Sequence, residues 1–373
     1  MPRTRRILST PLAGALVALA VGAAPAHAQG LQRSLDRVVD AGVPGAALLV
    51  REDGRTRRLA SGLADVARRR AVRPGDRFRV GSITKTFVAV RTLQLAGAGA
   101  LSLDDSVERW LPGVVPGGAG ISVRQLLQQT SGLFDYTADE RVLAPYLAGD
   151  LAYVWAPRAL AEIAASHPPV FPPGQRWEYS NTNYLLLGLL VEAAGGAPID
   201  AQLRDHIIRP LGLRATELPS GQAIAGAHAH GYTLFERPPF VDITALHPSW
   251  GWAAGALVST ADDLARFYRA LLGGRLLAPA LLRQMTSTVA MGTPGERYGL
   301  GLWKTQHLNS QGFTLQCGAA WGHNGDLPGY SAFAFASRDA RHQFVLLLNT
   351  DPESMKRSAQ LALRRVIAHA YCG

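Results

Sequence analysis

Apolar and polar positions alternate near both ends of the chain, as they do in β-hairpins. Residues 45–65 predict two strands around an Asp-Gly turn, and residues 329–350 predict a second hairpin. In that second hairpin the first strand alternates, and the second is more continuously apolar. Amphipathic helices are predicted at 31–42 and 355–371. Both chain ends therefore supply strands and helices to one layered structure.

Between these ends the apolar positions recur mostly at helical spacing, and joints rich in Gly and Pro separate the segments. The predicted helices cover residues 122–132, 156–166, 181–196, 200–213 and 260–274. The pattern predicts an α/β (α+β) fold, with an antiparallel sheet formed from both chain ends, flanking helices and a largely helical inserted domain. We expect the sheet domain at 29–104 and 251–373, and the helical domain at 105–250.

The first 28 residues have the features of a secretory signal peptide. An arginine-containing start precedes an apolar centre, and the small residues "AHA" at 26–28 form a candidate cleavage site. The stretch "TRRIL" weakly resembles a twin-arginine signal, so the export route stays open. The longest later apolar stretch is interrupted by Glu192, which argues against a membrane anchor. We expect a secreted mature protein.

Charge and cysteine content narrow the function classes. The net charge of +10 becomes 10 − 3 = +7 without the three arginines of the signal peptide, and the remaining arginines are scattered. This distribution argues against a nucleic-acid partner and allows only loose attraction to an anionic cell wall. Cys317 and Cys372 are an even pair in an exported chain, which favours a disulfide over two free thiols.

A pair of histidines, His228 and His230, forms an H-x-H motif in "AGAHAHGY". No third ligand is evident nearby, and the two cysteines do not have a zinc-like spacing. We interpret the pair as exposed loop residues and predict no metal and no cofactor.

The first candidate catalytic motif is "VGSITKTFVAV". Of the 38 basic residues only Lys85, Lys304 and Lys356 are lysines, and Lys85 lies in an apolar run. A buried lysine can lose its proton and act as a base, whereas arginine stays protonated. A helix beginning at Ser82 would place the Lys85 amine against the Ser82 hydroxyl. The alternative is a serine N-cap followed by a lysine whose amine reaches solvent.

Two further motifs follow. "WEYSNTNY" offers the Tyr179 phenol and the Asn181 amide before a helix, although an ordinary helix entry would look the same. "WGHNGDLPGY" places His323, Asn324 and Gly325 at a strand edge, where a backbone can approach a ligand closely, or where a bulge could lie. Each motif is weak alone, and the three in this order are much more specific.

Together these motifs resemble the serine β-lactamase and penicillin-binding protein superfamily, which uses Ser-x-x-Lys, a Ser- or Tyr-based motif, and Lys-Thr-Gly. The Tyr-x-Asn form is that of class C β-lactamases, and His in place of Lys is similar to secreted D-alanyl-D-alanine carboxypeptidases. Stretches such as "PPGQRWEYSNTNY" and "GHNGDLPGYSAFAFASRD" extend the resemblance over most of the chain. The chain contains no G-x-S-x-G elbow, phosphate loop or dinucleotide fingerprint.

The resemblance implies acyl transfer through a covalent serine ester. Ser82 would attack a carbonyl, and Lys85, Tyr179 or both together would accept its proton. Tyr179 would then protonate the leaving group. The sequence leaves the identity of the general base open.

The resemblance also implies substrate-binding residues. Asn181 would hold the acyl-side amide, and the backbone N–H groups of Ser82 and Asp326 would form the oxyanion hole. His323 would keep the site electropositive and tune it with pH. Trp250 would line the cleft, although core packing explains it nearly as well.

One position does not fit a carboxypeptidase, which must bind a free carboxylate. Asp326 follows Gly325, and "YGLGLWKTQ" offers only Lys304 as a nearby cation. The leading prediction is nevertheless a secreted D-alanyl-D-alanine carboxypeptidase acting on cell-wall peptides. The alternatives are an esterase or β-lactamase on the same scaffold and a protein that binds β-lactams or wall peptides and acylates without turnover. For each we expect a monomer with a peptide or small-molecule substrate.

Overall fold

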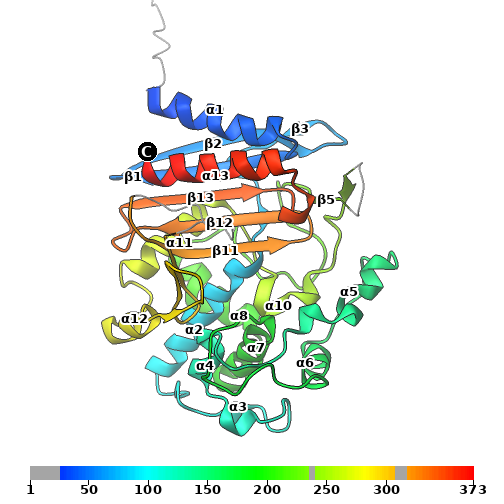
Figure 1. Cartoon of the computed structure of the whole chain (residues 1–373), viewed down its shortest axis with the longest axis vertical. Coiled ribbons are helices and arrows are strands. Elements are labelled where there is room, and N and C mark those ends of the chain that lie inside the picture. The colour runs from blue at the N-terminus through cyan, green and yellow to red at the C-terminus, as the bar shows by residue number, and fades with distance from the viewer. Residues whose placement is uncertain (1–25, 235–239, 307–316) are drawn as a thin grey trace, which may run out of the picture.

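The computed structural model describes residues 26–234, 240–306 and 317–373. Its centre is a nine-stranded sheet in the order β3-β2-β1-β13-β12-β11-β10-β9-β8, in which every neighbouring pair is antiparallel (Figure 1). The strands are β1 Gly45–Glu52, β2 Arg55–Asp65, β3 Arg70–Ala71, β8 Val289–Ala290, β9 Glu296–Tyr298, β10 Trp303–Thr305, β11 Ala320–Leu327, β12 Tyr330–Ala336 and β13 His342–Leu348. The predicted α/β class, with an antiparallel sheet made from both chain ends, is confirmed.

The two predicted hairpins are β1–β2 and β12–β13. Asp53 and Gly54 have φ values of 44° and 84°, and a type I′ hairpin turn requires positive φ at both of these central positions. Strand β12 is buried along its whole length and does not show one wet face, because helices cover both sides of the sheet. The alternation seen in the sequence there separates two buried faces: Phe333 and Phe335 point to one side of the sheet, and the alanines between them point to the other.

Helices α1 (Ala26–Asp40) and α13 (Arg357–Cys372) lie together on one face of the sheet (Figure 1). Their apolar side chains form one core cluster with alternate residues of β1, β12 and β13, such as Leu48, Phe335 and Leu346. The opposite face packs on helices α2 (Thr84–Gly97) and α11 (Ala261–Leu272) in a second, larger cluster. This larger cluster continues into the helical part of the molecule, so the two parts share one core.

The helical part is built around α7 (Asn181–Gly195), which is buried along most of its length. The other helices are α3 Val107–Trp110, α4 Val123–Gln128, α5 Glu140–Leu147, α6 Pro157–Ala165, α8 Ile199–Leu203, α9 Arg209–Leu211, α10 Trp252–Gly255 and α12 Pro279–Met285. Two short strand pairs accompany them: β4 Phe78–Arg79 with β7 Val258–Ser259, and β5 Tyr232–Thr233 with β6 Val241–Asp242. The predicted domain boundaries stay predictions.

The predicted signal peptide, residues 1–28, lies almost wholly outside the described residues, and α1 begins at Ala26. Among the described residues no single helix has the length and apolar composition of a membrane span. One pair, residues 181–195 with 199–211, meets both criteria jointly but is bent by 78°.

Cys317 and Cys372 form the predicted disulfide, which joins the end of α13 to the segment before β11. Because it closes a loop of 55 residues, it restricts the unfolded chain, and the entropy model assigns about 4 kcal/mol to this restriction. We expect Cys317→Ser to lower the free energy of unfolding by about 2–4 kcal/mol. Guanidinium unfolding of the variant and the oxidised wild type measures this difference, and equal midpoints and slopes would contradict it.

Candidate active site

A cavity of about 400 Å³ lies where β11 faces the start of α2 and the start of α7. It brings together the sequence-predicted residues Ser82, Tyr179, Asn181, Trp250, His323, Asn324, Gly325 and Asp326. Lys85 lies directly behind this wall, with its Nζ 2.9 Å from Ser82 Oγ. Three segments far apart in sequence therefore meet at one place.

Ser82 lies in a short 3-10 turn, Gly81–Ile83, and not in the first turn of an α-helix as predicted. Strand β4 leads directly into this turn, and Gly81 has a φ of +52°, which a residue with a side chain rarely adopts. Helix α2 begins only at Thr84. The serine is consequently held on a tight turn between a strand and a buried helix.

The turn lies very close to strand β11. A methyl group on Gly325 would lie 2.0 Å from the carbonyl oxygen of Val80 and 2.7 Å from the amide nitrogen of Ser82. Gly325 is thus required because two backbone segments touch there, whereas the sequence suggested that a ligand approaches it. Since β10 pairs with only the first three residues of β11 (320–322), the rest of β11 is left to form the cavity wall.

Lys85 is fully buried, and three oxygen atoms surround its amine. Nζ lies 2.9 Å from Ser82 Oγ, 2.7 Å from Asn181 Oδ1 and 2.7 Å from the carbonyl oxygen of Ala254. Loss of water on burial lowers the pKa of Lys85 to about 7, and the charge of Asp135 partly opposes this decrease. Both the charged and the neutral amine are therefore accessible near neutral pH.

The Tyr179 hydroxyl donates a hydrogen bond of 2.7 Å to Ser82 Oγ. The extended segment that carries Tyr179 is held by Gln129. The backbone carbonyl of Gln129 accepts from the N–H of Glu178, and its side-chain Oε1 accepts from the N–H of Ser180. Burial raises the pKa of Tyr179 well above its ordinary value. The phenol therefore stays protonated at neutral pH.

Asn181 is the first residue of α7, and its side chain has three partners. Oδ1 accepts from Lys85, while Nδ2 lies 3.0 Å from Asp135 Oδ2 and 3.1 Å from Thr137 Oγ1. Hydrogen bonds therefore hold both the oxygen and the nitrogen of the Asn181 amide, and the side chain also lines the cavity.

His323 is buried and does not carry the positive charge that the sequence suggested. Its Nε2 lies 3.0 Å from the Tyr298 hydroxyl, and its Nδ1 is hydrogen-bonded to the carbonyl oxygen of Asn324. Burial lowers the pKa of His323 to about 3, and the charge of Lys85 contributes. The expectation of a titrating, electropositive His323 is wrong, because aromatic rings replace water around the imidazole.

Several lining residues were not predicted as site residues: Tyr136, Thr137, Trp177, Met291, Tyr298 and Trp303. Tyr136 donates a hydrogen bond of 2.6 Å to the carbonyl oxygen of Trp250 and so links two walls. Trp177 lies two residues before Tyr179 in an extended segment, which places both side chains on one side. That spacing was a usable signal.

Lys304 does not line the catalytic cavity. Its Nζ lies 5.5 Å from the centre of the Trp321 ring, while its neighbour Trp303 lines the cavity. Among the described residues that line the cavity there is no arginine or lysine, and Asp326 is one of them. A carboxylate of a substrate would therefore meet Asp326 without a compensating cation from this set.

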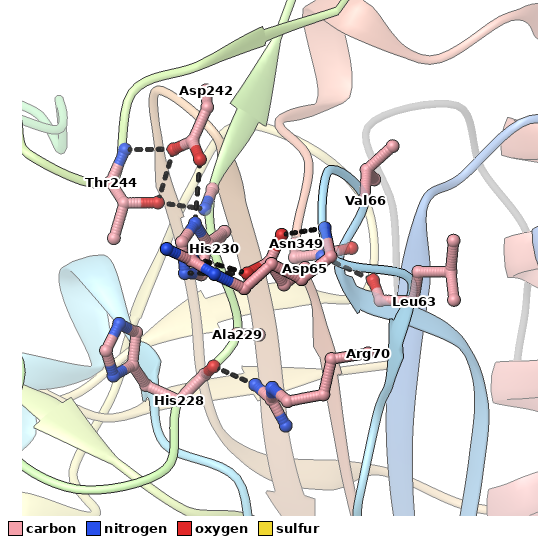
Figure 2. A network of polar contacts seen from close by, with 12 residues as sticks. Leu63, Asp65, Val66, Arg70, His228, Ala229, His230, Asp242, Thr244 and Asn349 are labelled. Carbon is pink, nitrogen blue, oxygen red and sulfur yellow. Dashed lines mark hydrogen bonds and ion pairs between the residues drawn. The ribbon is translucent and has the colours of Figure 1, made fainter.

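His228 and His230 lie outside the catalytic cavity, in a separate polar network (Figure 2). His230 Nδ1 is 2.7 Å from Asp242 Oδ2, and His230 Nε2 is 3.7 Å from Asp65 Oδ2. The two imidazole rings stack 5.4 Å apart and are half-buried. No group of three or more potential metal ligands occurs in residues 26–234, 240–306 and 317–373.

Comparison with known proteins places this cavity in a family context. The Beta-lactamase family model matches residues 27–369. The solved D-stereospecific amidohydrolase from Streptomyces sp. is similar with a TM-score of 0.83 and 38% identity, over 94% of this chain and 99% of that one. Esterase EstB of Burkholderia gladioli is 27% identical, over 91% of this chain and 96% of its own length. Penicillin-binding protein 4* of Bacillus subtilis is 27% identical over 80% of this chain, which spans 66% of that relative.

Proposed function

Because the chain belongs to the Beta-lactamase family of serine hydrolases, we propose that it cleaves amides or esters of D-amino acids through a covalent ester on Ser82. The observation that carries this proposal is the contact of Ser82 Oγ with both Lys85 Nζ and the Tyr179 hydroxyl inside one cavity. A nucleophile within hydrogen-bond reach of its base is the arrangement that covalent catalysis requires.

We assign the role of general base to Lys85. Tyr179 holds its proton because of its raised pKa and donates it to Ser82 Oγ. The Ser82 proton is then directed toward Lys85, whose neutral amine can accept it while donating to Asn181 Oδ1 and the carbonyl oxygen of Ala254. The serine is thus polarised from two sides before it attacks.

After the attack, the new oxyanion requires donors. The backbone N–H groups of Ser82 and Asp326 are the proposed pair, and the close packing of Gly325 against the Ser82 turn supports this assignment. The departing amine or alcohol takes a proton from Tyr179, which Lys85 replenishes. Water then cleaves the serine ester by the same path in reverse.

The substrate class follows from charge. With Asp326 in the wall and Lys304 turned toward Trp321, a free carboxylate is repelled, and this disfavours a D-alanyl-D-alanine carboxypeptidase. An amide or ester group in the same position is uncharged and meets no such penalty. The D configuration rests on the similarity to the D-stereospecific amidohydrolase.

A substrate panel tests this choice. We expect kcat/KM for D-phenylalanine amide to exceed that for the L-amide and that for a D-Ala-D-Ala peptide with a free carboxylate, each by at least ~10-fold, which corresponds to about 1.4 kcal/mol. Release of ammonia measures hydrolysis of the amides, and release of D-alanine measures cleavage of the peptide. Hydrolysis of a p-nitrophenyl ester and of a chromogenic cephalosporin is measured alongside. Preferred release of D-alanine would restore the carboxypeptidase function, and preferred cephalosporin hydrolysis would indicate a β-lactamase.

Intact-mass analysis after exposure to penicillin, followed over time, separates turnover from mere acylation. A mass increase that decays is expected for a hydrolase, and a permanent adduct would indicate a binding protein that acylates without turnover. Secretion belongs to the same proposal and rests on the signal-like first 28 residues.

A further inference from the structure

A second cavity, of about 550 Å³, adjoins the catalytic cavity on the side of the sheet that carries α13. The two cavities share five lining residues: Trp177, Met291, Trp303, Asn324 and Asp326. A molecule bound at Ser82 can therefore extend past the edge of β11 into the second cavity. The second cavity is therefore continuous with the space in front of Ser82.

The wall of the second cavity is mainly apolar. Phe333 and Phe335 of β12 form one side, and Leu363 and Ile367 of α13 form the other. Alternation along β11 explains the geometry: Asn324 and Asp326 pair with Phe333 and Ser331, on the face opposite to His323. The Asp326 side chain consequently belongs to this α13-side face, while its backbone lies beside Ser82.

The charged groups in this wall are mainly negative. Asp326, Glu296 and Glu353 are carboxylates and Arg364 is a cation, so the described lining residues sum to 1 − 3 = −2. Glu296 is occupied by hydrogen bonds from Trp303 and Thr305, which leaves Asp326 and Glu353 as the carboxylates relevant to a ligand. The Asp326 carboxylate accepts a long hydrogen bond of 3.3 Å from Asn324 Nδ2 and also interacts with the Ser331 hydroxyl. Because its two oxygens together can accept about four hydrogen bonds, the carboxylate retains capacity for a ligand.

The surroundings of Asp326 favour a cationic neighbour. Asp326 is exposed at the edge of β11, yet desolvation by the surrounding protein raises the pKa of its carboxyl group to about 7. The nearby carboxylates of Glu353 and Asp351 add to the increase. A positive charge placed among these carboxylates would stabilise the ionised form of Asp326 and so lower its pKa again.

We propose that this second cavity is a substrate subsite for a positively charged amine carried on an apolar, preferably aromatic, group. The amine would pair with Asp326 and Glu353, and the apolar part would pack between Phe335 and Leu363. This inference rests on the proposed hydrolase function and specifies its substrate: an amide or ester that bears an arylalkylamine. It also assigns Asp326 a role in binding a cationic substrate group, in addition to its repulsion of carboxylates.

Competitive inhibition tests this subsite with simple probes. Hydrolysis of a p-nitrophenyl ester is measured at pH 8.5 with 4-phenylbutylamine, which is protonated, or with 4-phenylbutanol, which is neutral and of similar shape. We expect the amine to inhibit at least ~10-fold more strongly in the wild type. This advantage should fall to about 2-fold or less in Asp326→Asn and shrink in Glu353→Gln, whereas Asp339→Asn, which removes an exposed carboxylate of the β12–β13 turn, should preserve it.

Cavity filling provides a second, independent readout. Leu363→Trp should weaken inhibition by both probes, and Leu361→Trp, on an exposed face of the same helix, should weaken neither. Equal inhibition by amine and alcohol in the wild type, or an amine advantage unchanged in Asp326→Asn, would overturn the subsite. Ester hydrolysis and labelling of Ser82 would persist in that case, so failure of the subsite is distinguishable from failure of the hydrolase function.

Discussion

Ser82→Ala is expected to abolish both hydrolysis and covalent labelling by penicillin. The Ser82 alcohol carries the proposed ester, while Lys85 and Tyr179, which contact its Oγ, are assigned to proton transfer. Loss of the nucleophile from such a unit typically costs roughly 10⁴-fold or more in kcat/KM. Ester hydrolysis gives the rate, and intact mass gives the labelling.

A matched control removes a different hydroxyl. Ser102 lies in an exposed loop, where its Oγ accepts from the backbone N–H of Asp104, and Ser102→Ala should keep full activity. Circular dichroism and the unfolding midpoint confirm that both variants are folded. Residual turnover or a penicillin adduct in folded Ser82→Ala would mean that the nucleophile lies elsewhere.

Local patterns predicted the elements that depend on local physics. The Asp-Gly turn and the alternation around it were enough for β1–β2, because turn geometry sets the register of a hairpin. Strands β8, β9 and β10 have two or three residues each, too few for any period to emerge, and they were not predicted. β8 pairs with β9 and β9 with β10, and only β10 joins the rest of the sheet, through three residues of β11.

The site shows the same division. Ser-x-x-Lys, Tyr-x-Asn and His-x-Gly identified the groups that meet at the cavity, because the family resemblance carries three spacings at once. The 3-10 turn at Ser82 was missed, since it depends on the positive φ of Gly81 beside β11. The side-chain directions of Lys304 and Asp326 could not be read either, because the register of β10 and β11 was unknown.

The charge of His323 was the clearest error, and its cause is general. A histidine at a strand edge titrates near neutral pH only if water reaches its imidazole ring. Here Tyr179, Tyr298 and Trp303 surround the ring, and none of these contacts is local in sequence. Protonation states depend on tertiary burial, which residue types alone do not reveal.

Lys85→Arg is expected to be nearly as damaging as loss of the serine, although it preserves the formal charge. The Lys85 position is fully buried, and its three oxygen neighbours fit a compact amine, not a planar guanidinium. Arginine also stays protonated and cannot accept the Ser82 proton. We expect kcat/KM to fall by about 10²–10⁴-fold, the usual contribution of a general base.

Two further variants make this result interpretable. Lys304→Arg changes a lysine that stacks on Trp321 outside the catalytic cavity, and it should leave ester hydrolysis unchanged. Lys85→Met keeps an unbranched side chain and buries no charge. If Lys85→Arg fails to fold, Lys85→Met still shows whether activity depends on the amine. Near-normal activity in either folded Lys85 variant would assign proton acceptance to another group.

The pH profile tests the same base in the unaltered protein. Because burial lowers the pKa of Lys85 to about 7, the neutral amine predominates above this value and the ammonium form below it. A base acts only when unprotonated, so kcat/KM for a neutral ester should rise with pH through about 7 and level off above it. Asp326 has a pKa in the same range, and Asp326→Asn separates the two groups. A rise that persists in Asp326→Asn belongs to Lys85, and its disappearance there would transfer the titration to Asp326 and remove the support for Lys85 as base.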